Sequence, residues 1–158
     1  MNLIKKASFP KIILPSIALG AGLLDNVLLL ISIFGIFALL GYMPGVQIVW
    51  LPLLVLCTAA LATGVGLVLG IFNVFIRDIA QIVPILINVF FWLTPIVYPA
   101  SIVPESYRHY LYYNPMYPLI KGYQDVLVFG VAPDLLEMLP TLLISLALLF
   151  LAFGLSNL

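Results

Sequence analysis

Charged side chains are scarce in this chain of 158 residues. Only 8% of the residues are Asp, Glu, Lys or Arg, whereas 65% are hydrophobic, and the mean hydropathy is +1.27. An ordinary soluble domain is about a quarter charged. A chain this short cannot hide so much apolar surface inside one water-soluble globule. The composition therefore predicts that lipid is the solvent over much of the chain.

Cysteine and histidine are nearly absent. Cys57 and His109 are the single residues of their types, and the formal net charge is zero. One cysteine cannot form an internal disulfide, and one histidine argues against a zinc site or a histidine-based catalytic triad. Zero net charge gives no basic surface for nucleic acid. We expect Cys57 to be a small apolar packing residue, and we expect no metal and no nucleic-acid partner.

Catalytic motifs are also missing. The sequence contains no Gly-x-x-x-x-Gly-Lys-Ser/Thr phosphate loop and no Gly-x-Ser-x-Gly elbow. The carboxylates Glu105, Asp125, Asp134 and Glu137 show no spacing that marks a catalytic pair, so we expect them to be solvated surface charges. The chain is therefore not expected to be an enzyme, nor to bind ATP by such a loop.

Long uncharged runs divide the chain into spans. No charge occurs between Asp25 and Arg77, which is too long a stretch for one crossing of about 20 residues. The turn-forming segment 41–45 divides it, so we predict spans at about 14–40 and 49–72. Two further apolar runs predict spans at about 79–97, with Pro84 bending it, and 138–157.

The segment 98–136 differs from these spans because it holds charges and many prolines. Its apolar patches are too short to cross a bilayer, which indicates short helices in an extracytoplasmic or re-entrant region. The sequence thus predicts a single all-α transmembrane domain over residues 1–158, with about four spans. Lysine and arginine are more frequent near the N-terminus and at Arg77 than in 98–136, which places the N-terminus in the cytoplasm.

Asp25 is the one charge inside a predicted span. A carboxylate at the membrane centre costs about 2.5–3.5 kcal/mol on insertion scales, so it should face protein or water. Two readings remain open: Asp25 lines a pathway, or it lies nearer an interface or bonds a neighbouring helix. Gly66 and Gly70 form a small-xxx-small pair in the second predicted span, and we expect it to serve packing within the subunit more than dimerisation.

Aromatic residues gather around residues 90–123. Seven of the eight tyrosines lie between residues 98 and 123, and Trp92 lies just before them. One interpretation is an aromatic belt at the outer membrane interface. The other is that some rings line a passage for sugars, because aromatic faces stack on pyranose rings. The candidate pathway residues are Asp25, Trp92, Tyr98, Tyr113, Asn114 and Tyr117.

Four segments carry a resemblance to a known family. They are residues 2–15 (NLIKKASFPKIILP), 73–84 (NVFIRDIAQIVP), 94–99 (TPIVYP) and 113–118 (YNPMYP). In this order and at these distances they resemble the permease subunits of ABC-2 type exporters, in the branch for O-antigen, capsular polysaccharide and teichoic acid. The resemblance begins just before the third of the family's six spans, so the first two have no counterpart here, as in a fragment, a split gene product or an incomplete gene model.

The resemblance implies roles for particular residues. Lys5, Lys6, Phe9 and Pro10, within segment 1–13, match the cytoplasmic segment that docks on the ATPase. Arg77 and Asp78 match a cytoplasmic turn, which we otherwise read as the simple end of a hydrophobic helix. Thr94, Pro95 and Tyr98 match the outer end of the fifth span of the family, and Asn114 and Pro115 match the re-entrant region before its last span.

The function implied is ATP-driven export of polysaccharide or lipid-linked glycan across the bacterial inner membrane. The implied partners are a separate nucleotide-binding ATPase subunit, which would bind the ATP, a second permease copy forming a homodimer, the glycan and membrane lipid. Two alternatives stay open: an exporter subunit for drug or lipid cargo, and a membrane assembly or regulatory protein that transports nothing.

Overall fold

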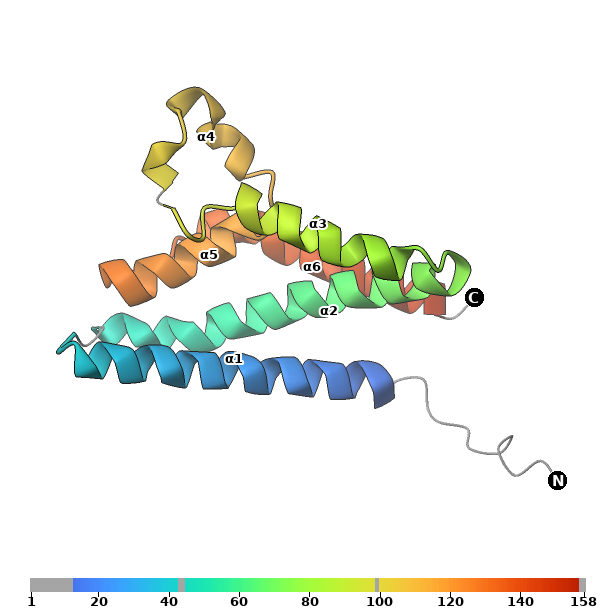
Figure 1. Cartoon of the computed structure of the whole chain (residues 1–158), viewed down its shortest axis with the longest axis horizontal. Helices are drawn as coiled ribbons and strands as arrows, with labels where there is room; N and C mark the ends of the chain where they lie inside the picture. Colours follow the sequence, from blue (N-terminus) through green and yellow to red (C-terminus); the bar gives the residue numbers. More distant parts are fainter. Residues whose placement is uncertain (1–12, 43–44, 99, 157–158) are drawn as a thin grey trace.

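The computed structural model describes residues 13–42, 45–98 and 100–156. These residues form helices joined by turns, and no strand occurs among them. The elements are α1 (Ile13–Leu39), η2 (Val46–Trp50), α2 (Leu51–Phe75), α3 (Ile79–Leu93), η3 (Ala100–Ile102), α4 (Glu105–Leu111), α5 (Tyr117–Gln124), η4 (Asp125–Phe129) and α6 (Leu135–Ser156). The long helices run side by side (Figure 1).

Three stretches are long and apolar enough to cross a membrane. They cover Ile17–Leu39 in α1, Val46–Phe75 in η2 and α2, and Leu135–Leu155 in α6. Each fits the roughly 20 residues that a crossing requires. The all-α membrane fold class is therefore confirmed, and these helices fall where spans 14–40, 49–72 and 138–157 were predicted.

The helix α3 is shorter than the predicted span 79–97. It has 15 residues and ends at Leu93, where Thr94 takes an extended conformation with φ −92° and ψ 132°. The reason is local, because Thr94 precedes Pro95 and a residue before proline is driven out of the helical region. At 1.5 Å per residue the helix is about 22 Å long, less than the roughly 30 Å hydrocarbon core.

The turn after α1 is a Schellman motif. Gly41 has φ +71°, its N–H donates to Ala38 O at 3.2 Å, and the Tyr42 N–H donates to Phe37 O at 2.9 Å. The Phe37 and Tyr42 rings meet edge to face with centroids 5.2 Å apart, which is the apolar contact that accompanies this cap. The tight turn sends the chain back along α1 as η2 and α2.

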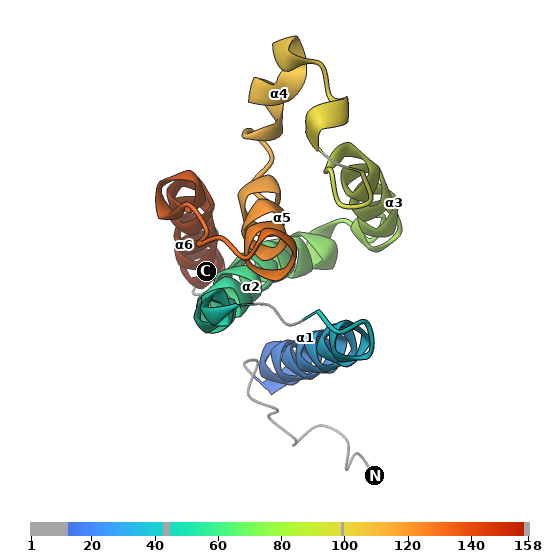
Figure 2. The ribbon, with the colours of Figure 1, turned by 90° about the vertical axis from the view of Figure 1, so that its left-hand side faces the viewer.

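The helix α2 is the centre of the described bundle. Figure 2 shows α1 on one side of it and α3, α5 and α6 on the other. One face of α2 contributes half of the buried apolar cluster, and the partners come from α5, η4 and α6. The cluster comprises Leu51, Leu54, Cys57, Leu61, Leu119, Val126, Leu127 and Met138. Cys57 is 1% exposed and free, as predicted for a packing residue.

The close approach of α2 and α6 occurs at Gly64. A Cβ on Gly64 would lie 3.0 Å from Leu148 Cβ and 3.2 Å from the Ser145 carbonyl oxygen, whereas one on Gly66 or Gly70 would meet nothing within 4 Å. The prediction that Gly66 and Gly70 form the packing pair within the subunit was therefore wrong. The small-xxx-small spacing identified the helix but not the face, because several small residues of α2 fit the same pattern.

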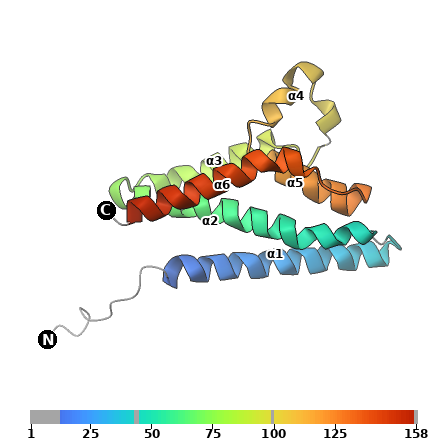
Figure 3. The ribbon, with the colours of Figure 1, turned by 180° about the vertical axis from the view of Figure 1, so that it is seen from behind.

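The region 98–136 forms short helices, as predicted. Figure 1 and Figure 3 show α4 standing away from the bundle, while α5 lies alongside α2. A π-helical turn, η4, extends α5 and ends at Gly130, which has φ +64°. The Tyr42 hydroxyl donates to Val128 O at 2.9 Å and so joins this turn to the α1–α2 connection.

We predict that Gly64→Val destabilises the bundle by about 1–3 kcal/mol, because the added methyl groups must push α6 away from α2. Gly66→Val is the matched control, since open space surrounds Gly66 in the same helix. The measurement is thermal unfolding of both purified variants in one detergent. Equal loss from the two substitutions would show that packing at Gly64 does not hold α6 in place.

Candidate functional site between α3, α5 and α6

The turn between α2 and α3 holds two of the predicted site residues. Arg77 and Asp78 are both exposed, and their side chains form no ion pair with each other. Asn73 orders the turn, because its Oδ1 accepts the Ala80 N–H at 3.1 Å. The turn lies at the end of the bundle where α6 ends (Figure 1). Two exposed charges on a short, ordered turn give this end of the described bundle a polar surface.

The predicted coupling residues lie outside the described residues. These are Lys5, Lys6, Phe9 and Pro10. Their assignment stays a prediction.

Two motif residues twenty positions apart meet in a buried junction. The Asn114 side-chain amide donates to Thr94 Oγ1 at 2.7 Å, and that hydroxyl donates in turn to Phe90 O at 2.7 Å. Thr94 is 1% exposed and Asn114 is 9% exposed. The Asn114 Oδ1 also accepts the Met116 N–H at 3.0 Å, which forms an Asx turn around Pro115. The junction therefore fixes the end of α3 to the start of α5.

Further polar bonds join this junction to its neighbours. Gln124 Nε2 donates to Pro95 O at 3.1 Å, and Thr141 Oγ1 donates to Pro115 O at 2.9 Å. Both prolines lie in turns between helices, where their own carbonyls are outside the helix hydrogen-bond ladders. α5 and α6 supply the missing donors. These groups are bonded to one another, so the junction positions backbone and offers no free nucleophile or base.

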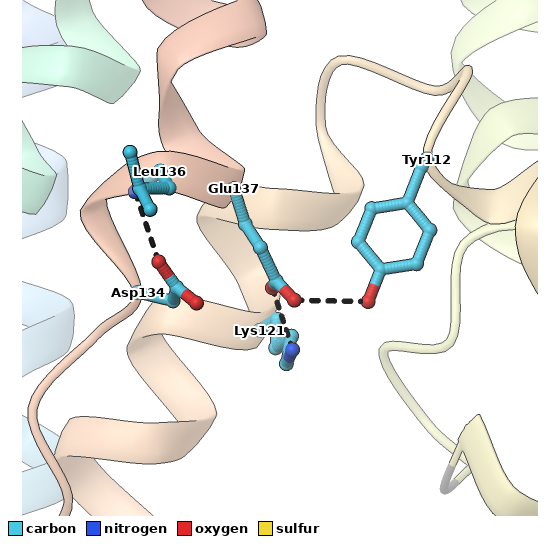
Figure 4. A network of polar contacts seen from close by, with 5 residues as sticks. All are labelled: Tyr112, Lys121, Asp134, Leu136 and Glu137. Atoms are coloured by element: carbon cyan, nitrogen blue, oxygen red, sulfur yellow. Dashed lines mark hydrogen bonds and ion pairs between the residues drawn. The ribbon is translucent and has the colours of Figure 1, made fainter.

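A partly buried ion pair links α5 to α6. Lys121 Nζ lies 2.5 Å from Glu137 Oε2, and the side chains are 33% and 27% exposed. The Tyr112 hydroxyl donates to Glu137 Oε1 at 3.1 Å, and the Lys121 Nζ lies 5.9 Å from the centroid of the Tyr112 ring (Figure 4). Asp134 caps α6 by accepting the Leu136 N–H at 2.9 Å. Both oxygens of the Glu137 carboxylate therefore have a partner, Tyr112 on Oε1 and Lys121 on Oε2.

Burial and neighbouring charges shift the pKa values of two groups in this region. Burial would lower the pKa of Lys121, but the hydrogen bond and the negative charge of Glu137 raise this pKa above its ordinary value of 10.5. Burial raises the pKa of the Asp125 carboxyl, although Lys121 opposes the rise. The expectation that Glu137 is a solvated surface charge was wrong, because folding brings Lys121 against it.

The aromatic residues divide into exposed and buried sets. Trp92 is 68% exposed and Tyr113 is 79% exposed. Tyr98 is half-buried, with its hydroxyl donating to Trp92 O at 3.1 Å. Tyr117, by contrast, is buried against Tyr112, with ring centroids 5.1 Å apart. Their roles in a pathway stay predictions, and the structure buries Asn114 and Tyr117.

Asp25 is not part of this site. It is exposed on α1, which lies across α2 from α3, α5 and α6 (Figure 2). The structure therefore brings Trp92, Tyr98, Tyr113, Asn114 and Tyr117 to one side of the bundle and leaves Asp25 on the other.

Sequence reasoning missed several residues of the site, namely Lys121, Gln124, Glu137 and Thr141. Lys121 and Gln124 lie in the charged segment 98–136, where nothing in the sequence sets them apart from solvated residues. Their partners depend on contacts between separate helices. Among the described residues, no group of three His, Cys, Asp or Glu side chains could hold a metal ion.

Comparison with known proteins adds the family context. Residues 1–128 match the family described as ABC-2 type transporter. Two proteins of Klebsiella pneumoniae, both called O-antigen export system permease protein RfbA, are 30% and 27% identical, each over 82% of this chain. A protein of the same name from Myxococcus xanthus is 30% identical over 96% of the chain. The aligned parts cover 50%, 51% and 59% of these relatives, so the chain spans about half their length.

We predict that Thr94→Val loosens the end of α3, because the Asn114 amide loses its acceptor inside the protein. An unsatisfied buried donor costs about 1–3 kcal/mol. Thr63→Val is the matched control, since Thr63 Oγ1 bonds Ala59 O in its own helix and no other group among the described residues. Thermal unfolding of the two variants in detergent compares them. A Thr94 variant no less stable than the Thr63 variant would contradict the importance of the junction.

We also predict a pH dependence for the Lys121–Glu137 pair. Because the pKa of Lys121 is raised in the fold, the pair stabilises the protein fully below the ordinary value of 10.5 and loses its effect as the pH rises through the raised pKa. Glu137→Gln should therefore melt at a lower temperature than the parent near pH 8, and this difference should shrink as the pH is raised beyond the ordinary value of 10.5. Glu105→Gln is the control, since Glu105 lies 3.9 Å from Arg108 and is 90% exposed. A difference that stays constant with pH would mean that the ion pair contributes nothing.

Proposed function

The chain belongs to the ABC-2 type transporter family, and we propose that it is part of the membrane-spanning permease of an ATP-driven exporter. The observation that carries the proposal is the family match over residues 1–128. The match includes α1, α2, α3, α4 and α5 and ends within η4. Long apolar helices and a chain without catalytic motifs suit a transport part that leaves ATP hydrolysis to a separate subunit.

The proposed cargo is a polysaccharide or a lipid-linked glycan. The three relatives described above carry names of O-antigen export permeases, which supports this class of cargo. Exposed aromatic rings, Trp92 and Tyr113 among them, suit contact with sugar faces. In this proposal Tyr98 also faces the glycan, while the buried Asn114 and Tyr117 support the backbone that carries the exposed rings.

The proposed partners are a nucleotide-binding ATPase subunit and a second permease copy. ATP would bind in the ATPase subunit. Lys5, Lys6, Phe9 and Pro10 would dock on it, and the charged turn at Arg77 and Asp78 would lie on the same, cytoplasmic side of the bacterial inner membrane. Two copies would then enclose the glycan between them.

The junction at Thr94 and Asn114 gives the proposal a mechanical element. It connects the α2–α3 turn, through the short helix α3, to α5 and α6. A ligand or partner shifts a conformational equilibrium only through different contacts with the two states. Movement of the charged turn on the ATPase would be transmitted along α3 to the region that carries the aromatic rings.

We predict that the chain, purified from gently solubilised bacterial membranes, brings down a polypeptide that is photolabelled by azido-ATP. Lys5→Glu together with Lys6→Glu should reduce recovery of this polypeptide at least about fivefold, because charge reversal opposes docking by about 1 kcal/mol or more. Arg108→Glu, a charge reversal in α4, should leave recovery unchanged.

Absence of any ATP-binding polypeptide with the parent chain would contradict the exporter proposal and favour a membrane protein that assembles or regulates. Equal recovery with the double variant would instead place the docking surface elsewhere. The cargo is a separate question, which glycosyltransferase genes beside this gene would decide in favour of glycan over drug or lipid.

A further inference from the structure

The helix α1 is covered least of the long helices. None of the residues described in its candidate span is buried, whereas 22% of the corresponding windows in α2 and α6 is buried. Its contact with the bundle is one-sided, because Leu30, Phe34 and Phe37 pack against the core cluster on α2. The residues on the opposite face of α1 are exposed in the described chain.

Asp25 lies on that opposite face. It precedes Phe34 by nine residues, which is two and a half helical turns, so the two side chains leave the helix on opposite sides. Asp25 is exposed, and no hydrogen bond or ion pair of its carboxylate occurs among the described residues. It comes 12 residues after Ile13 and 14 residues before Leu39, so its short side chain reaches neither end of the helix. A carboxylate at this depth is costly in lipid.

The residues around Asp25 form a heptad stripe. Ala18, Asp25 and Ser32 are seven residues apart, and a further residue follows each of them by four positions. All six are exposed: Ala18, Gly22, Asp25, Leu29, Ser32 and Ile36. A seven-residue repeat is the pattern of a helix that packs along a partner helix at a small crossing angle. Small residues allow close approach, and a polar residue in such a seam sets the register. Ser32 bonds Leu28 O in its own helix, which leaves Asp25 as the polar residue of the stripe without a partner among the described residues.

We propose that this face of α1, the Asp25 stripe, seats another membrane helix that presents a lysine or arginine side chain at the level of Asp25. Charge complementarity favours this occupant over lipid, because a cation neutralises the carboxylate. Charge complementarity also favours such a helix over a second copy of the chain. The described cations are Arg77, Arg108 and Lys121, none of them on α1, so two symmetric copies would bring Asp25 against Asp25. The inference does not depend on export or on an ATPase.

The experiment uses the full chain in phosphatidylcholine vesicles with a donor dye on an N-terminal tag. The probes are synthetic leucine–alanine membrane helices that carry an acceptor dye and either one lysine or one leucine at the centre. We expect energy transfer to show that the lysine helix binds about fivefold to thirtyfold more tightly than the leucine helix. Asp25→Asn should remove this preference, while Glu105→Gln, which removes an exposed carboxylate in α4, should keep it.

A second variant tests the face without touching the carboxylate. Gly22→Leu fills the seam one turn from Asp25, where a Cβ meets nothing in the chain, so it should weaken binding of the lysine helix and leave the fold intact. Equal binding of both probes, or binding of neither, would overturn the proposal in favour of a lipid-facing or water-lined surface. Energy transfer between two copies of the chain that increases in Asp25→Asn would overturn it in favour of self-association through this face.

Discussion

The obligation to satisfy polar groups inside the protein is the constraint on which the rest of this structure depends. In hydrocarbon no water is at hand, so backbone N–H and C=O groups pair within helices and polar side chains need protein partners. The backbone groups of the described chain follow this rule along α1, α2, α3 and α6, where they pair within the helices. Where the helices break, at Pro95 and Pro115, side chains from α5 and α6 donate to the freed carbonyls. The breaks are therefore built features of the fold.

The same constraint separates two parts of the molecule. On one side of α2, polar residues are paired: Thr94 with Asn114, and Lys121 with Glu137. On the other side, Asp25 has no partner among the described residues. A satisfied junction holds α3, α5 and α6 in one arrangement, whereas an unsatisfied carboxylate on a heptad stripe indicates a surface to be covered. The first supports the proposed transport function, and the second points to assembly.

Packing around α2 explains which helices can move together. The close contact at Gly64 locks α6 to α2, and the buried cluster at Leu54 and Cys57 adds α5 and η4. By contrast, none of the residues of α3 is buried, and it is held mainly at its ends, by the turn at Asn73 and the bond at Thr94. A helix held mainly at its two ends is suited to carry movement from one end to the other. This is the physical basis for assigning α3 the transmitting role.

The sequence by itself determined the solvent and the helices. Scarce charge and long apolar runs predicted an all-α membrane protein, and the order of the motifs around Arg77, Thr94 and Asn114 indicated its family, because both are properties of neighbouring residues. The extent of α3 was also encoded locally, in the proline after Thr94, although the prediction overlooked it. Only the tertiary structure decided that Thr94 bonds Asn114, that Lys121 pairs with Glu137, and that Gly64 rather than Gly66 meets α6. Those outcomes depend on which helix faces come together, and hydrophobicity that is nearly uniform around α1, α2 and α6 does not specify a face.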